Sequence, residues 1–442
     1  MMYENAKGSR QPNCTLKKET DSHQDSGHED DLRNIKMKLF ERFRKTLSSL
    51  YTKRDRPPTS HADSNSNDES EVQRGHYVFP AEWERHEATI MGFPSRCSLP
   101  PDQYEAVCNE LAQLAAAISE FESVRMYVRP EEIQLAESVV KPCVKDASRI
   151  SFIPCPINHC WVRDTGPVYI RDPTGKFPHR RFAINFRFNE WGGKKPENDG
   201  VCWGQQWPLM DETALAENAD FARWVIEHDR VPAPVTMIES PIRAEGGGLV
   251  TDGEGTLLIS ESSIVCDVRN PGMSRAQIET ELKRLLGIEK VVWFPGRRNV
   301  DITDVHMDAE ARFVRPGEIA YSKPHDVAIE LWQELSAEIR EILGRETDAK
   351  GRSLQIHTIQ EPDPGGLVKS DQDELSASYV NFYFVNGGLI IPKFGDEERD
   401  QMALEMFQRL LPERVIRQVY ASAIPLTGGV LHCVTQQVPA IQ

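Results

Sequence analysis

The strongest constraint on the fold of this chain is a helix followed by a strand, repeated five times after residue 100. In each unit, apolar residues recur every three or four positions and then give way to a short strand-like run. The predicted pairs are 104–121 before 123–128, 212–228 before 235–238, 275–286 before 291–294, 327–343 before 354–359, and 398–411 before 415–420. Extra short strands are predicted at 182–186, 256–260, 311–314 and 379–384. This alternation predicts an α/β fold, and a doubly wound sheet stays open as an equal alternative.

Two of these helices have recognisable ends. Ser274 and Gln277 have the spacing of a capping box at the start of the third helix, and Gly287 follows its last apolar residue. Gly344 follows Leu343 in the same way and predicts the end of the fourth helix. No glycine motif of the dinucleotide-binding or P-loop type follows a predicted strand, so neither ligand is expected.

The first 75 residues differ in composition from the rest. Ser, Asp, Asn, Lys and Arg dominate residues 1–75, which predicts a mostly disordered extension before a folded domain over 76–442. Within the extension, apolar residues at steps of three or four predict a basic amphipathic helix over 32–50. Such a helix docks on a partner or membrane surface, or packs as an appendage on its own domain or on a homo-oligomer. The second interpretation is favoured.

Charge and cysteine usage narrow the functional classes. The formal charge is −16, but residues 1–75 carry 14 basic and 13 acidic residues, so residues 76–442 carry −17. Such a surface repels nucleic acid and attracts small cations. No run reaches the roughly 18 apolar residues of a membrane span, and no signal peptide is visible. Nine cysteines without a Cys-x-x-Cys pair predict reduced thiols in the cytoplasm and no zinc cage.

Cys433 is the first candidate for chemistry. It follows the glycines of Thr427-Gly428-Gly429-Val430-Leu431-His432-Cys433, and we expect it on a short strand among His, Thr and Gln side chains. A reactive cysteine needs a lowered pKa or an acid/base partner, whereas a structural cysteine is simply buried. Both interpretations stay open for Cys433 at this point.

The sequence Asp304-Val305-His306-Met307-Asp308-Ala309 alternates polar and apolar residues. Alternate residues of a strand share a face, so Asp304, His306 and Asp308 are expected to line one side. A strand with a solvated polar face is the simpler interpretation of this segment taken alone. A metal site is not favoured, because no second His or Cys stands nearby at a ligand spacing.

Two loops add carboxylates. Trp161-Val162-Arg163-Asp164-Thr165-Gly166-Pro167 has the composition of a tight turn, and its Trp161 and Asp164 would offer a flat wall and a carboxylate to a planar cation. Glu245 precedes three glycines, which let backbone approach closely whatever Glu245 faces. Taken together, a thiol, a histidine and separate carboxylates suit attack on the carbon of a guanidinium, whose fork pairs with carboxylates.

The sequence closely resembles the agmatine deiminase family, within the guanidine-modifying enzymes that include the Porphyromonas-type peptidylarginine deiminases. The motifs span nearly all of 79–440. They are 79–89 (FPAEWERHEAT), 161–167, 189–194 (NEWGGK), 245–248, 252–258 (DGEGTLL), 378–383 (SYVNFY), 386–388 (NGG) and 432–437 (HCVTQQ). The resemblance implies a pentein fold, a five-bladed α/β propeller with pseudo-fivefold symmetry, as the catalytic domain over 76–442.

The resemblance also implies roles. Cys433 would attack the guanidinium carbon and form a covalent amidino-thioether, while His306 would protonate the departing ammonia and then activate water. Asp164 and Asp308 would hold the guanidinium nitrogens, and Glu245 would assist His306. The remaining substrate-binding candidates are Trp161, Arg163 and Asp304. No metal or organic cofactor is implied.

The chain departs from the family pattern near the histidine. Ile302 stands where relatives that act on agmatine usually carry a second acid, in contact with the far amine of the substrate. Val305 and Ala309 replace a usual Gly and Asn, and Thr427 and Val430 replace a usual Gly and Asn near the nucleophile. The reaction type is therefore more strongly predicted than the substrate.

The sequence predicts a cytoplasmic hydrolase acting on C–N bonds of linear amidines, which converts agmatine to N-carbamoylputrescine and ammonia. A deiminase of protein-bound arginine or of another guanidine is the alternative within the same chemistry. A non-catalytic pentein that binds a partner is less favoured, because Cys433, His306, Asp164 and Asp308 are all present. An amidinotransferase stays open, since an amine can intercept the same covalent intermediate.

Overall fold

Five small β-sheets form the framework of the folded part. The computed structural model describes residues 77–174, 180–193, 210–230, 232–366 and 376–441. One sheet has four strands in the order β16 (Thr435–Pro439), β1 (His86–Gly92), β2 (Ser123–Val128) and β3 (Ile150–Pro154). The other four sheets have three strands each: β4 (Val168–Ile170), β5 (Arg181–Asn185) and β6 (Val235–Glu239); β7 (Val250–Thr251), β8 (Thr256–Ser260) and β9 (Lys290–Phe294); β10 (Ala311–Arg315), β11 (Glu318–Lys323) and β12 (Gln355–Gln360); β13 (Tyr383–Val385), β14 (Gly388–Lys393) and β15 (Val415–Tyr420).

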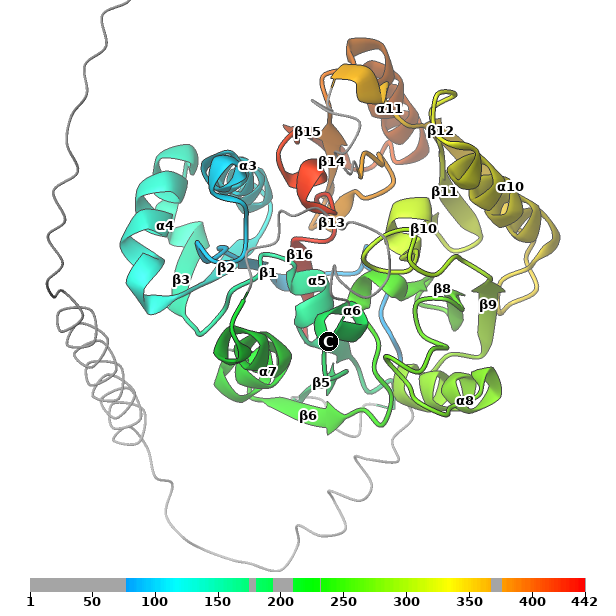
Figure 1. The fold of residues 1–442 in the computed structure, drawn as a ribbon, viewed down its shortest axis with the longest axis horizontal. Helices are drawn as coiled ribbons and strands as arrows, with labels where there is room; N and C mark the ends of the chain where they lie inside the picture. The colour runs from blue at the N-terminus through cyan, green and yellow to red at the C-terminus, as the bar shows by residue number, and fades with distance from the viewer. Residues whose placement is uncertain (1–76, 175–179, 194–209, 231, 367–375, 442) are drawn as a thin grey trace, which may run out of the picture. The chain divides into compact units, whose positions relative to one another are not determined.

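All five sheets share one pairing pattern. The first strand pairs antiparallel with the second, and the second pairs parallel with the next. Parallel neighbours require a crossover connection, which a helix normally supplies. The crossover helices are α3 (Pro101–Ser119), α7 (Glu212–His228), α8 (Arg275–Leu286), α10 (Glu330–Arg345) and α11 (Glu397–Leu410). Figure 1 shows these helices toward the outside of the folded part and the five sheets arranged around its centre.

Shorter elements connect the strands. Beside α4 (Ile133–Val140), the short helical turns are α5 (Val162–Thr165), α6 (Glu190–Gly193) and α9 (Met307–Glu310). The 3-10 turns are η1 (Pro130–Glu132), η2 (Lys141–Cys143), η3 (Ala147–Arg149), η4 (Gly246–Gly248), η5 (Pro364–Gly366) and η6 (Ile424–Thr427).

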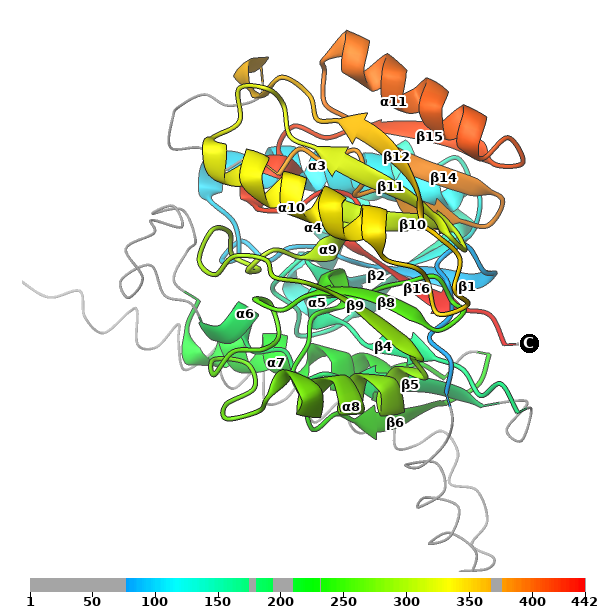
Figure 2. The same ribbon diagram turned by 90° about the vertical axis from the view of Figure 1, so that its right-hand side faces the viewer.

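Each long helix has a buried apolar face, and Figure 2 shows α10 and α11 lying beside the strands of their own sheets. In α8, Ile278, Leu282 and Leu285 follow the helical repeat and pack with Leu257 and Ile259 of β8. Burying one such side chain contributes about 1.5–3 kcal/mol. The apolar spacing that predicted each helix is therefore the spacing that attaches it to a sheet.

The ends of the folded part meet in the first sheet. β1 pairs antiparallel with β16, so that Met91 lies opposite Thr435 and Ile90 opposite Gln436. The last strand is thereby fixed in a sheet formed mainly by the first segment of the fold. This pairing also fixes the turn just before β16, which contains Cys433.

The predicted alternation is confirmed, since all five helix-then-strand units occur within a few residues of their expected bounds. The capping box of Ser274 and Gln277 is present at the start of α8. Gly287 ends α8 with a φ of 67°, in the left-handed region that glycine tolerates.

Two predicted element ends were wrong. Helix α10 does not end at Gly344 but runs through it to Arg345. The strand expected over 379–384 begins only at Tyr383, because the preceding residues form a turn. In that turn, the Asn381 amide donates to the carbonyl of Ser378 and the Val380 amide donates to the Ser378 hydroxyl.

The extension and its predicted helix over 32–50 lie outside the described residues, so the domain boundary at 75/76 stays a prediction. In the part of the chain that the structure describes, no helix combines the length and the apolar content needed to cross a bilayer.

Candidate active site

The candidate residues occupy equivalent places in the five sheets. In each sheet, the segment just before the first strand of the antiparallel pair carries one or two of them. Asp164 lies in α5 before β4, Glu245 precedes η4 and β7, and His306 and Asp308 lie at α9 before β10. Asn381 precedes β13, and Cys433 precedes β16. The shared topology therefore directs residues distant in sequence toward one place.

Gly247 shows how closely these groups converge. A methyl group at this position would lie 2.7 Å from Nδ1 of His306, 2.9 Å from Oδ1 of Asp164 and 3.0 Å from Oδ2 of Asp308. Real Cβ atoms do not approach other atoms so closely. Three predicted site residues thus surround one glycine, which has no side chain to separate them.

Asp164 is buried and held at both oxygens. Its Oδ1 accepts a hydrogen bond from the Gly247 amide at 2.9 Å, and its Oδ2 accepts one from Nε1 of Trp191 at 2.8 Å. Burial raises the pKa of Asp164, and the carboxylates of Asp308 and Glu245 add to this, although His306 opposes them. A cation placed beside Asp164 would relieve this unfavourable charge.

His306 lies between two carboxylates. Its Nδ1 is 3.6 Å from Oδ2 of Asp164 and its Nε2 is 3.6 Å from Oε2 of Glu245. Burial disfavours the charged ring, but Asp164, Glu245 and Asp308 outweigh it and raise the pKa of His306 to about 9. His306 is therefore an imidazolium at neutral pH. Among the described residues, Nε2 has no partner within hydrogen-bond distance, so its proton is available to a bound molecule.

Glu245 is fixed on its other side by Arg269. The Arg269 Nε lies 2.7 Å from Oε1 of Glu245, and its Nη1 lies 2.7 Å from Oδ2 of Asp304. All three side chains are buried, and this arrangement holds the pKa of Glu245 below its usual range against the effect of burial. Asp304 thus lies behind Glu245, where it pairs with Arg269.

The strand predicted over 304–309 is wrong. Asp304 and Val305 have φ angles of 62° and 72°, which no strand permits, and helix α9 begins at Met307. The carboxylate of Asp301 accepts hydrogen bonds from the amides of Thr303 and Val305 and so holds the tight loop. Alternation of polar and apolar residues imitated a strand pattern here, although His306 and Asp308 still face one site.

Cys433 lies in a turn two residues before β16, not on the strand expected for it. Its Sγ is 3.6 Å from Oδ2 of Asp308 and 3.3 Å from Nδ2 of Asn381. Burial raises the pKa of the thiol well above its usual range, and Asp308 and Asp164 raise it further. Burial and these two carboxylates therefore favour the protonated form of the thiol.

The turn that contains Cys433 is packed against Trp161, and the loop before it is anchored upstream. A methyl group on Gly429 would lie 2.7 Å from the Trp161 ring and 3.0 Å from Cβ of Cys433, so Trp161 is close to the thiol. Upstream, the buried carboxylate of Glu110 accepts hydrogen bonds from the amides of Ser422, Ala423 and Ile424. These contacts order the loop that leads to Cys433.

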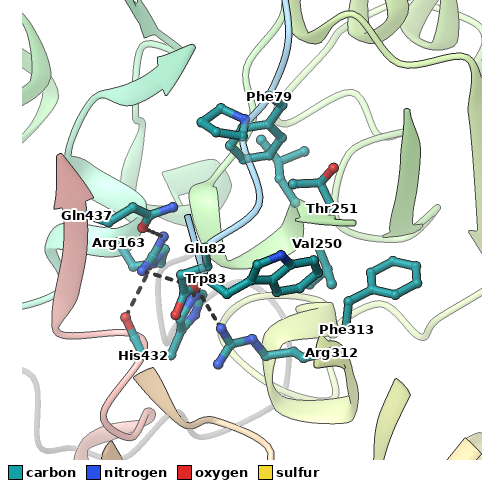
Figure 3. A pocket seen from close by; sticks show the side chains of 12 residues that line it. Phe79, Glu82, Trp83, Arg163, Val250, Thr251, Arg312, Phe313, His432 and Gln437 are labelled. Atoms are coloured by element: carbon teal, nitrogen blue, oxygen red, sulfur yellow. Dashed lines mark hydrogen bonds and ion pairs between the residues drawn. The ribbon is translucent and has the colours of Figure 1, made fainter. Parts of the chain in front are cut away.

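Arg163 does not reach the centre of this group. Its guanidinium donates to Oε1 of Gln437 at 2.7 Å and to the carbonyl of His432, and it lies 3.8 Å from Glu82. Figure 3 shows it beside Glu82 and His432, in the wall of a cavity of about 30 Å³. The structure thus places Arg163 and Asp304 behind the site. It brings the other six predicted residues together: Cys433, His306, Asp164, Asp308, Glu245 and Trp161.

Sequence reasoning gave no role to five further residues that contact the site or its supports. Four of them fall within the motifs that carry the family resemblance: Asn381, Trp191, Glu82 and His432. Of these, His432 was the easiest to identify as a site residue, because it adjoins Cys433. Arg269 falls outside them, and nothing in the sequence distinguished it from a surface arginine. Among the described residues, no cluster of three or more His, Cys, Asp or Glu side chains is arranged to hold a metal ion.

The raised pKa of His306 predicts a pH-dependent stability. Because the folded-state pKa is about 9, against about 6.5 when unfolded, this stabilisation is complete below pH 6.5. It is lost as the pH rises toward 9, by an amount on the order of a few kcal/mol. Urea unfolding of His306→Gln and of the unchanged protein at several pH values measures it. Identical pH slopes for the two proteins would contradict the assignment.

The comparisons with known proteins agree with this geometry. Residues 78–439 match the sequence profile of the family described as Porphyromonas-type peptidyl-arginine deiminase. A Latilactobacillus sakei protein named "Putative agmatine deiminase" is 33% identical over 82% of this chain and 96% of its own length. The solved agmatine deiminase of Enterococcus faecalis is 27% identical, with a TM-score of 0.69 over 86% of this chain and 99% of that one. That of C. jejuni shares the fold at 22% identity and a TM-score of 0.65, over 82% and 96%. The chain therefore belongs to the Porphyromonas-type peptidyl-arginine deiminases, in the agmatine deiminase family, and has their α/β pentein fold.

Proposed function

We propose that this chain is an agmatine deiminase, which hydrolyses agmatine to N-carbamoylputrescine and ammonia. The observation that carries the proposal is the convergence of His306, Asp164 and Asp308 around Gly247, with the Cys433 thiol 3.6 Å from Asp308. Family membership and relatives named for this activity support it. The chemistry of the site supports it independently, because a thiol among buried carboxylates suits a cationic carbon electrophile.

In this proposal, Asp164 and Asp308 hold the nitrogens of the guanidinium. Buried carboxylates without a cation are unfavourable, so a planar cation that accepts both is favoured. The same cation offsets the negative charge that keeps the Cys433 thiol protonated. Substrate binding therefore lowers the pKa of its own nucleophile and creates the thiolate when it is needed.

The first half-reaction forms a bond between Sγ of Cys433 and the guanidinium carbon. The thiol proton is released when the cation binds, the carbon–nitrogen bond to one terminal amino group breaks, and that group takes a proton from His306 and leaves as ammonia. His306, which is charged at neutral pH, delivers the proton to the leaving nitrogen. Trp161 forms a wall next to the reacting sulfur.

In the second half-reaction, His306 is neutral and accepts a proton from water. The oxygen bonds to the amidino carbon, the carbon–sulfur bond breaks, and the thiol is restored with release of the ureido product. Glu245, held by Arg269, keeps His306 in place between the two half-reactions. Since the same ring gives and then takes a proton, its raised pKa suits both steps.

Ile302 is the residue that bears most directly on which guanidine is the substrate. It lies 3.9 Å from the position of a methyl on Gly428, so it borders the glycine turn before the nucleophile. An apolar side chain here offers no charge to a distant amine, and this observation keeps deimination of an arginyl peptide as the second candidate. In Ile302→Glu, we expect the KM for agmatine to fall about tenfold with little change in kcat, since an added ion pair contributes to binding in both ground and transition states. Ile302→Gln is the neutral control, and equal KM values for the Glu and Gln variants would contradict the expectation.

A competition assay tests the proposed function. Agmatine, free arginine and a blocked arginyl peptide are supplied together to the full chain, and both ammonia and each ureido product are measured. Preferential carbamoylputrescine formation supports the proposal, whereas preferential citrulline formation in the peptide supports the second candidate. Transfer of the amidino group to an added amine without ureido product would identify an amidinotransferase.

We further propose that the five sheets are the blades of a closed propeller, which the repeated pairing pattern and the β1–β16 pairing support. The site assignments, a cytoplasmic location, a homo-oligomer and the absence of nucleic-acid partners remain predictions from the sequence.

A further inference from the structure

A layer of charged side chains that are buried or, in the case of Glu82, nearly buried lies behind Cys433. Glu82 accepts a hydrogen bond from Nη2 of Arg312 at 2.6 Å, lies 3.8 Å from Nη2 of Arg163, and is 2.8 Å from Nε2 of His432. Figure 3 shows Glu82 between the two arginines, with His432 beside it. Removing ions from water costs several kcal/mol each, so this cluster is an expensive support if its only role is packing.

His432 connects this layer to the site. Its Nδ1 is 2.7 Å from Oδ2 of Asp308, and its Nε2 is 2.8 Å from Oε2 of Glu82. The same Oδ2 of Asp308 lies 3.6 Å from Sγ of Cys433. An unbroken series of contacts therefore runs from Glu82 through His432 and Asp308 to the nucleophile.

His432 is also fixed at its backbone. Its amide donates to Oδ1 of Asn381 at 2.9 Å, while Nδ2 of that asparagine contacts the Cys433 sulfur. The ring is buried, and close contacts at both of its nitrogens, with Asp308 and Glu82, restrict its rotation. The Asp308 carboxylate can therefore turn from Cys433 only by breaking a buried, charge-assisted hydrogen bond.

We propose that His432 is a positioning residue of the deiminase reaction: supported by Glu82, it keeps the Asp308 carboxylate ionised and oriented toward Cys433. The inference rests on the proposed function, because that function gives Asp308 the task of holding the guanidinium. His432 does not contact the reacting atoms and acts through Asp308.

Three variants of the full chain test this role. His432→Leu removes both contacts, and we expect kcat/KM for agmatine to fall by about 10- to 100-fold, as for loss of a charge-assisted hydrogen bond. His432→Asn keeps a donor near the Nδ1 position and should recover most of this loss. Glu82→Gln keeps the size of the side chain but loses its charge, so its kcat/KM should lie between those of the Leu and Asn variants. It replaces the Leu variant in the test if that variant does not fold.

The pH profile distinguishes positioning from simple structural damage. Asp308 must be ionised to bind the cation, and His432 helps to hold its pKa below the usual range despite burial. Arg312 and the ring of His306 act in the same direction and stay in all variants. In His432→Leu, the pKa of Asp308 rises, so the acid limb of kcat/KM should move to higher pH, while damage alone lowers the whole profile without moving it.

Glu122→Gln is the matched control. Glu122 is a buried glutamate paired with a histidine, His86 at 3.0 Å, but it contacts neither Asp308 nor Cys433. It should keep kcat/KM within about twofold and leave the acid limb in place. Folded His432→Leu or Glu82→Gln protein with unchanged kcat/KM and an unmoved acid limb would overturn the inference.

A second readout does not depend on agmatine turnover. The rate at which 2-chloroacetamidine labels Cys433 reports whether Asp308 presents an amidinium to the sulfur. If the unchanged protein is labelled but releases no ammonia from agmatine, the proposed substrate is wrong but the positioning role is not contradicted. Slower labelling of His432→Leu than of His432→Asn would still support that role. Equal labelling rates for these variants and the unchanged protein overturn it.

Discussion

Cys433→Ala is expected to lose agmatine turnover by on the order of 10⁴-fold or more, because the proposed covalent intermediate forms on the sulfur that this substitution removes. The thermal unfolding temperature should change little, since the substitution removes one atom from a turn that Asn381 and Trp161 still support. Steady-state ammonia release and mass spectrometry after incubation with substrate measure the effect. The unchanged protein should show the mass of an amidino adduct when quenched during turnover, and the variant should not.

Cys97→Ala is the control for that experiment. Cys97 is exposed and contacts Ser95 and Asn158, away from the carboxylates that surround Cys433. Its loss should leave turnover and adduct formation intact. Ammonia release by Cys433→Ala at a rate near that of the unchanged protein would exclude Cys433 as the nucleophile.

Gly247→Ala is expected to have the second largest effect, a loss of at least about 100-fold in kcat/KM, because small displacements of reacting groups are costly. The added methyl group would need the space between His306, Asp164 and Asp308, which lie 2.7–3.0 Å from its position. At least one of these groups must move, although Gly247 and Trp191 hold the Asp164 carboxylate and His432 contacts that of Asp308. Measured kcat and labelling of Cys433 by chloroacetamidine should fall together.

Gly344→Ala is the matched substitution for this comparison. Gly344 lies inside α10, and a methyl group there would have only a side-chain atom of Arg340 at 3.5 Å. This variant should be as active as the unchanged protein and up to about 1 kcal/mol more stable, since alanine favours a helix. A Gly247→Ala variant with the activity of Gly344→Ala would show that the groups around Gly247 do not act in catalysis.

The sequence predicts the helices well for a physical reason. A helix such as α8 must bury a stripe of apolar residues, and that stripe is visible as spacing along the chain. The local errors have equally local causes. Polar and apolar residues alternate over 304–308 by coincidence, because Asp301 closes a tight loop there and left-handed backbone at Asp304 and Val305 prevents a strand.

The sequence predicts those site residues that a motif marks individually. It does not predict residues whose role depends on an ion pair with a residue far away in the sequence. Cys433 and His306 stand out by their chemistry, but nothing along the chain shows that Arg269 connects Glu245 to Asp304. The partners are 24 and 35 positions apart from that arginine. Likewise, Glu82 and His432 meet across 350 positions, and the pairing of β1 with β16 brings their two segments together.

That pairing of the first strand with the last has a consequence for synthesis of the protein. A ribosome delivers β1 long before β16, so the first sheet must wait for this edge partner until every segment between the two strands has been made. Contacts so distant in sequence form slowly, because a long loop must close first. Cys433 takes its place beside Asp308 only after these intervening segments have been made, so a chain that has not yet reached β16 carries the carboxylates without the thiol. Reactivity is thereby delayed until the whole catalytic unit exists.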